Sequence, residues 1–179
     1  MKKSLLILAL LSAGLVQAQV TTNLGATSDY RFRGISQTQN APAIQGGIDY
    51  AHKSGVYIGN WNSSVSSQLY TNGSGVESDL YAGYKKEVLG VTLDVGSYNY
   101  FYPRASVAKT NYDTKEVYAG VAKGPVSVKV SQSLGDYFAA SNSKGTRYFQ
   151  ADLAYPVAGT KVSVLAHAGK TDVANNTNS

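Results

Sequence analysis

Charged side chains recur at alternate positions along this chain, in segments whose intervening residues are apolar. In residues 76 to 86, for example, Glu77, Asp79 and Lys85 alternate with Val76 and Leu80. Charged rings of this kind orient or select small ions and solutes in channels. Nine residues share the predicted charged face, seven of them acidic: Asp29, Asp49, Glu77, Asp79, Lys85, Asp94, Glu116, Lys129 and Asp152. This set predicts a lumen that admits small hydrophilic solutes and prefers cations.

Two arginines extend this set at the end of the first segment. Residues two apart in a strand share a face, so a slightly longer first strand would place Arg31 and Arg33 inside the mouth of the lumen. Tyr30 and Phe32 would then face outward. The alternative is that the charges pair with one another across the interior and rigidify a plugged structure. The sequence leaves both interpretations open.

Patterns typical of catalysis or metal binding are weak. His52 lies in a predicted turn and His167 near the end of the last predicted strand. Neither has a spaced partner that would make a metal site or a Ser–His pair. The Gly-rich stretch 72–75 precedes no predicted helix, so it does not match a phosphate-binding loop. We therefore expect no enzyme activity, no cofactor and no metal.

Nine strands are predicted to position these side chains, from apolar–polar alternation with period two. Their expected ranges are 19–30, 43–51, 55–65, 76–86, 91–101, 114–123, 126–135, 146–155 and 160–169. The connectors alternate between long and short, and Gly and Pro mark the short ones. Transmembrane β-barrels have short turns at one end, long loops at the other, and strands of about 9 to 11 residues. The pattern predicts an all-β fold, an antiparallel transmembrane β-barrel of about 10 to 12 strands when complete.

Alternation by itself also fits a soluble β-protein whose apolar face points inward. Leu and Phe are sparse after residue 18, too sparse to fill the interior of a soluble barrel. Aromatic residues gather at the strand ends, as in the girdles at a membrane interface. Those expected towards the long loops are Tyr30, Phe32, Tyr98, Tyr100, Phe101, Tyr137, Phe138 and Tyr148, and those towards the short turns are Tyr50, Tyr57, Tyr84 and Tyr155. We expect the apolar faces to point outward to lipid, and leave the orientation of strand 55–65 open.

Residues 1–18 are typical of a secretory signal peptide, with Lys2 and Lys3 before an apolar stretch and Ala18 at the cleavage site. Residues 19–179 would then form the barrel domain. Without Lys2 and Lys3, 14 basic side chains face 11 acidic ones, a net charge of +3 that argues against nucleic acid as a partner. The chain has no cysteine, so packing, sheet closure or lipid must stabilise it instead of disulfides.

Four segments carry a resemblance to a known family. They are SDYRFRGISQ at 28–37, PAIQGGIDY at 42–50, YIGNW at 57–61 and ESDLYAGY at 77–84. The chain resembles the TorF family of porins over most of residues 19–179, most specifically before residue 65. The resemblance implies an outer-membrane β-barrel of Gram-negative bacteria with a channel role, and it brings no catalytic residue.

The last residues differ from the usual end of such a barrel. Residues 171–179 resemble an external loop, whereas barrels normally finish with a strand that ends in an aromatic residue. A single-chain bacterial barrel has an even number of strands, so we expect one or three strands beyond the nine, and a chain truncated at its C-terminus.

These observations predict an outer-membrane, porin-like channel for passive diffusion of small hydrophilic solutes or ions. The alternative is a non-conducting barrel that acts as an adhesin or a structural surface protein through external loops at 102–113 and 136–145. A soluble periplasmic binding protein is a third possibility. The expected partners are outer-membrane lipid and small solutes, and a homo-oligomer is compatible with the sequence.

Overall fold

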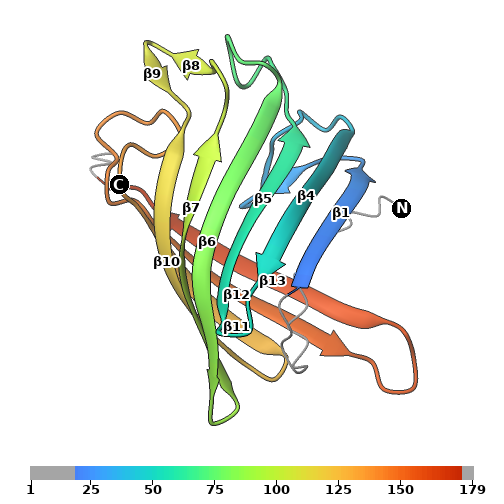
Figure 1. Cartoon of the computed structure of the whole chain (residues 1–179). Coiled ribbons are helices and arrows are strands. Elements are labelled where there is room, and N and C mark those ends of the chain that lie inside the picture. Colours follow the sequence, from blue (N-terminus) through green and yellow to red (C-terminus); the bar gives the residue numbers. More distant parts are fainter. Residues whose placement is uncertain (1–18, 175–179) are drawn as a thin grey trace.

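A computed structural model describes residues 19–174 of the chain. It contains one nine-stranded antiparallel sheet in which every strand pairs with its neighbours along the chain (Figure 1). The strands are β1 (Gln19–Thr27), β4 (Ala43–Ala51), β5 (Val56–Ser64), β6 (Val76–Val88), β7 (Val91–Phe101), β10 (Thr114–Lys123), β11 (Val126–Ser133), β12 (Arg147–Pro156) and β13 (Ser163–Asp172). The all-β, antiparallel prediction and the nine strands are confirmed. The predicted signal peptide at residues 1–18 lies outside the described residues.

Several strand ends differ from the prediction by one to three residues, and two of these differences change how the loop end is built. The strand β1 stops at Thr27 rather than residue 30, because the chain then folds back and the Gln37 amide donates to the Tyr30 carbonyl at 2.7 Å. The strand β13 runs to Asp172, so the beginning of the predicted external loop at residues 171–179 pairs with β12 instead.

Two of the long connectors contain small hairpins that the alternation did not predict. One consists of β2 (Arg31–Phe32) and β3 (Ile35–Ser36), and the other of β8 (Ser106–Val107) and β9 (Thr110–Asn111). Each of these strands has two residues, which is too short for a period of two to show. Within residues 19–174 no helix is long and apolar enough to cross a membrane.

The sheet is strongly curled, but it is not closed into a barrel. Strand β1 pairs with β4 alone and β13 with β12 alone, so two edges of the described sheet remain unpaired. In Figure 1 the front of the molecule is formed by β1 and β4 to β6, while β12 and β13 cross behind them. The described residues therefore form a curled open sheet, and the nine strands do not by themselves make the predicted barrel of 10 to 12.

Short turns lie at one end of the sheet and long connectors at the other, as predicted (Figure 1). We call these the turn end and the loop end. Each of the four short turns has a glycine at positive φ, as at Gly55 (99°) and Gly124 (57°), a conformation that glycine adopts without a steric penalty. Both glycines lie in turns that the sequence predicted.

The two faces of the sheet have opposite chemistry. The outer face carries exposed aliphatic side chains, which reach 84% exposure at Leu24, while the inner face carries most of the predicted charged set. Strand β5, whose orientation was open, follows the same rule: Val56 and Ile58 lie outward, and Tyr57 and Trp61 inward. The predicted outward position of the apolar faces is confirmed as a property of the sheet.

The main apolar core lies on the inner face, at the loop end. Its buried members are Tyr30, Ala43, Val65, Tyr70, Tyr100, Tyr102 and Ala105, with Phe32, Trp61, Tyr98, Tyr112 and Phe138 packed against them. We call these twelve residues the aromatic plug. Several were predicted to form the outer girdle at this end. That prediction was wrong for Tyr30, Phe32, Tyr98, Tyr100 and Phe138, because connectors that fold over the inner face bury these rings.

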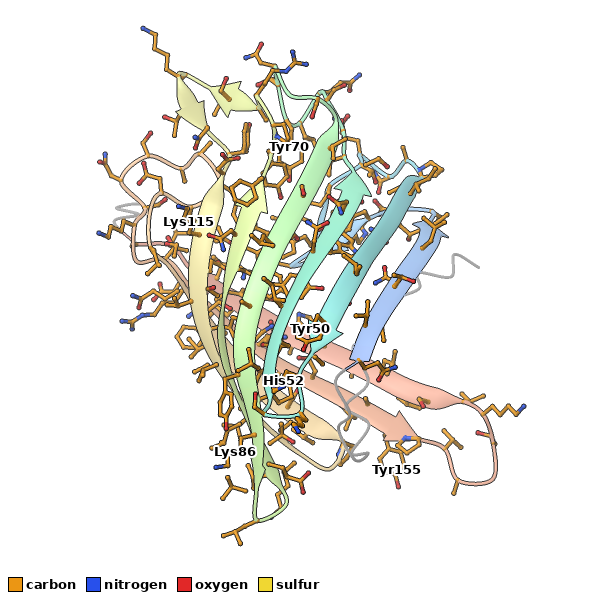
Figure 2. The ribbon with its side chains drawn as sticks, viewed as in Figure 1. Tyr50, His52, Tyr70, Lys86, Lys115 and Tyr155 are labelled. Carbon is orange, nitrogen blue, oxygen red and sulfur yellow. The ribbon has the colours of Figure 1, made fainter. Side chains whose placement is uncertain are left out.

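At the turn end, three of the four aromatic residues predicted there lie on the outer face. Tyr50, Tyr84 and Tyr155 are exposed on the outer face, and Figure 2 shows Tyr50 and Tyr155 near that end. Tyr57 is the exception, because it turns inward and donates a hydrogen bond to Asp94. At the loop end, Phe101 is exposed on the outer face as expected.

Candidate functional site

The inner face of the sheet carries nearly all of the predicted charged residues, and its turn-end half is polar and partly exposed. Strands β4, β7, β11 and β12 place Asp49, Asp94, Lys129 and Asp152 there, each partly exposed. Residue Lys85 on β6 lies opposite Asp94 on β7, and their charged groups are 3.7 Å apart. The alternation thus brings these five residues to one surface, as predicted.

Several tyrosines lie across this surface, each over a glycine on a neighbouring strand that leaves room for the ring. The ring of Tyr81 covers Gly59 and its hydroxyl donates to Asp49 at 2.5 Å. The Tyr57 ring covers Gly83 in the same way and its hydroxyl donates to Asp94 at 2.7 Å. A Cβ at Gly59 would lie 2.4 Å from the ring, closer than real Cβ atoms approach. The abundance of Tyr and Gly in the sequence is thus partly explained by rings that hold carboxylates in place.

The same arrangement recurs further along the sheet. Tyr118 covers Gly96 and its hydroxyl contacts that of Tyr57, while Lys129 lies 5.2 Å from the centre of the Tyr118 ring. A cation over an aromatic face is stabilised by the ring quadrupole. Charges on the inner face are therefore held by phenols as well as by each other.

His167 makes two side-chain hydrogen bonds on the inner face, and the sequence did not predict either partner. Its Nδ1 lies 2.5 Å from Asp152 Oδ1, and its Nε2 lies 2.9 Å from the Tyr148 hydroxyl. Tyr148 reaches it by covering Gly169. Both ring nitrogens are engaged, and the trio links β12 and β13 through side chains. Only the strand register, which pairs Asp152 with His167, indicates that these two residues meet.

The loop-end half of the inner face is closed over by a buried ion pair. Arg33 Nη1 and Nη2 donate to the two oxygens of Glu116 at 2.8 and 2.7 Å, and the Arg33 side chain is 8% exposed. The guanidinium also lies 4.2 Å from the centre of the Tyr148 ring. Burial lowers the pKa of Arg33, but the hydrogen bonds to Glu116 outweigh it and raise that pKa above its ordinary value. This bidentate pair of Arg33 and Glu116, which we call the buried fork, fastens the first long connector to β10.

Two further acids in this half have carboxylate oxygens without a partner. Glu77 is 0% exposed, and its Oε1 accepts a hydrogen bond from Tyr30 at 3.1 Å. Within the described residues, Glu77 Oε2, Asp79 Oδ1 and the Tyr102 hydroxyl are buried without a hydrogen-bond partner. Burial and the nearby charge of Glu77 raise the pKa of Tyr102 well above its ordinary value. Two neighbouring buried acids without a cation are a destabilising arrangement.

Asp29 and Arg31 take a different position from the one predicted. Arg31 lies at the surface, its side chain 48% exposed and its Nε 2.7 Å from Asp29 Oδ2. Asp29 accepts hydrogen bonds from the hydroxyls of Ser36 at 2.5 Å and Thr38 at 3.2 Å. The Ser36 bond and the Arg31 charge hold the pKa of Asp29 below its usual value. The two residues shape the first connector rather than lining the inner face, because the chain leaves the strand at Thr27.

The described residues contain no group of three or more His, Cys, Asp or Glu side chains arranged to hold a metal ion. The family model of a bacterial protein of unknown function (Gcw_chp) matches residues 13–179 of the chain. No curated protein and no solved structure matches the chain.

Proposed function

We propose that this chain, which belongs to the Gcw_chp family of bacterial proteins of unknown function, is an outer-membrane β-barrel that passes small hydrophilic solutes or ions. The observation that carries the proposal is the inverted distribution of polarity. The outer face is aliphatic and exposed, while charged and hydroxyl groups cover the inner face. In a bilayer, an apolar band must face lipid and polar groups must face a lumen.

The proposal requires the sheet to close. The open edges of β1 and β13 would leave backbone amides and carbonyls unpaired in lipid, at a cost of several kcal/mol for each group. Because such barrels have an even number of strands, one or three further strands between β13 and β1 would complete the proposed barrel of ten or twelve. A barrel of that size lies between the filled and the open classes, so its pore is narrow.

Solutes would pass along the turn-end half of the inner face, where charged groups remain partly exposed. Asp49, Asp94 and Asp152 face Lys85 and Lys129 there, an excess of acid that favours cations. The test is conductance of refolded protein in planar bilayers, with a heat-shift gel to verify closure. Discrete steps that depend on salt support the channel, and a reversal potential that favours chloride under a salt gradient contradicts the cation preference.

A second function is favoured by the aromatic plug. Tyr30, Tyr70, Tyr100 and Tyr102 are buried across the loop end, and Arg33 ties the first connector over β10. A closed barrel that gives no conductance steps would be a non-conducting surface protein acting through its loops. Deleting residues 136–145 would then abolish surface adhesion, whereas in a channel it would spare conductance.

A further inference from the structure

The outer face of the sheet has a groove that the proposed pore does not use. It spans β7 to β13, is open along the surface, has a volume of about 890 Å³ and is almost entirely apolar. Leu93 and Val95 on β7 lie at one side, Ala168 on β13 at the other, and Phe149 and Ala151 on β12 between them. Small side chains among larger ones leave room for extended hydrocarbon.

Three basic residues mark the loop end of this groove. Lys115, Arg147 and Lys170 are exposed and alternate with inward residues on β10, β12 and β13, so all three lie on the outer face. Lys170 also lines the groove itself. Figure 2 shows Lys115 beside the loop end of β10.

The strand register sets how far apart these bases are. Arg147 lies opposite Gln132, and Lys170 opposite Phe149, one row nearer the turn end. Lys115 lies one row beyond Arg147 towards the loops, where its carbonyl accepts from Leu134 at 2.8 Å. With strands about 4.8 Å apart, the backbones of Lys115 and Arg147 are separated by roughly 10 to 12 Å. The cluster is wide enough to contact more than one anionic group.

Most of the positive charge in the cluster is free for a ligand. Asp172 lies opposite Arg147, but Arg147 Nε donates to Gln132 at 3.0 Å rather than to a carboxylate. Among the ion pairs of the described residues, none involves Lys115, Arg147 or Lys170. Three bases and one acid leave a net charge of +2 at the rim.

We infer that this surface binds a phosphorylated glycolipid of the outer leaflet, with its acyl chains in the groove and its phosphates on Lys115, Arg147 and Lys170. Arginine recognises phosphate through two parallel N–H donors, and lysine acts as a compact charge. A groove that becomes basic at one end matches a lipid with several chains and an anionic head. The inference rests on the proposed function, because it places the loop end in the outer leaflet.

The test compares lipid binding by purified protein in detergent, with lipid A and its fully dephosphorylated form as probes. The first variant combines Lys115→Gln, Arg147→Gln and Lys170→Gln. Its matched control is Lys86→Gln with Lys123→Gln, which removes outward-facing charge at the turn end, where Figure 2 places Lys86. We expect the first variant to lose on the order of tenfold or more in lipid A affinity, and the control less than about threefold.

The groove is tested separately with Ala151→Phe, which fills the part of it between Val128 on β11 and Ala168 on β13. We expect weaker binding of both lipids, because the acyl contacts are lost whether or not phosphate is present. Equal affinity of the unmodified protein for the two lipids, or equal loss in the two charge variants, would overturn the inference. Loss of the heat shift in Ala151→Phe would make Ala168→Leu the variant to use.

Membrane extraction distinguishes failure of the lipid-binding inference from failure of the proposed function. Protein that leaves the membrane in carbonate without detergent would contradict the outer-membrane barrel itself. Protein that needs detergent and gives conductance steps, but does not prefer lipid A, would contradict only the lipid site.

Discussion

The two halves of the inner face carry the same residue types, but those residues have different roles in each half. At the loop end, Glu77, Asp79 and Glu116 are buried beneath aromatic rings. At the turn end, Asp94 and Asp152 remain partly exposed and are held by Tyr57 and His167. The strands present acids to both halves alike, so the long connectors decide which acids are buried. Acids at the loop end should therefore govern stability, and those at the turn end solute passage.

The largest effect should come from breaking the buried fork at the loop end. Arg33→Ala leaves Glu116 buried without its cation, and we expect a loss of about 3 to 5 kcal/mol in the free energy of unfolding. Urea unfolding followed by fluorescence of the single tryptophan, Trp61, measures it. Arg31→Ala is the control, because this exposed pair should be worth less than about 1 kcal/mol. Equal losses in the two variants would contradict the division into halves.

A smaller loss should follow from filling the space beneath a ring. In Gly83→Ala the new Cβ would lie 2.4 Å from the Tyr57 hydroxyl and 2.7 Å from the Val95 carbonyl oxygen. We expect a loss of about 1 to 3 kcal/mol from overpacking. Gly120→Ala on the same face meets nothing nearer than 3.4 Å and should unfold close to the unmodified protein. A comparison of urea midpoints decides, and equal midpoints would show that the ring is not locked.

A gain in stability should follow from neutralising a buried acid that has an unpartnered oxygen. Asp79→Asn removes charge beside Glu77, and we expect unfolding to require about 1 kcal/mol more. The same chemical change in Glu116→Gln should destabilise, because it removes the carboxylate that Arg33 binds. Thermal unfolding of the two variants gives the opposite signs directly. Destabilisation by Asp79→Asn would mean that the charged form of Asp79 is satisfied in the folded protein.

The smallest effect on stability, and the clearest on function, should come from the turn end. Lys85 and Asp94 form a loose, partly exposed pair, so Lys85→Gln should change stability by less than about 1 kcal/mol. It also removes a positive charge from the proposed lumen. We expect the reversal potential under a salt gradient to shift towards stronger cation selectivity. An unchanged potential would place the solute path elsewhere.

Much of the sheet could be predicted from the sequence because its cause is local. Residues two apart share a face whatever the rest of the chain does, so the spacing of Glu77 and Asp79 is sufficient to place both on the same face. The turns at Gly55 and Gly124 could be predicted because a glycine permits the local backbone conformation that a tight turn needs. The alternation also separated the aliphatic outer face from the charged inner one.

The positions of Tyr30, Phe32 and Arg33 could not be predicted this way. They follow the last regular residue of β1, where the chain turns back and the period of two no longer applies. Arg33 finds Glu116 at a distance of 83 residues along the chain, a contact that depends on how the connector lies over the sheet. The ring of Tyr148 over Gly169 likewise depends on the pairing of β12 with β13.

The sequence by itself determined the strands, their turns and the two chemical faces, because each depends on neighbours within a few residues. Only the tertiary structure decided which charges are buried, which tyrosines hold them, and that the described sheet is curled but open. Those outcomes depend on strand register and on connectors that bring distant residues together, and neither is encoded in local periodicity.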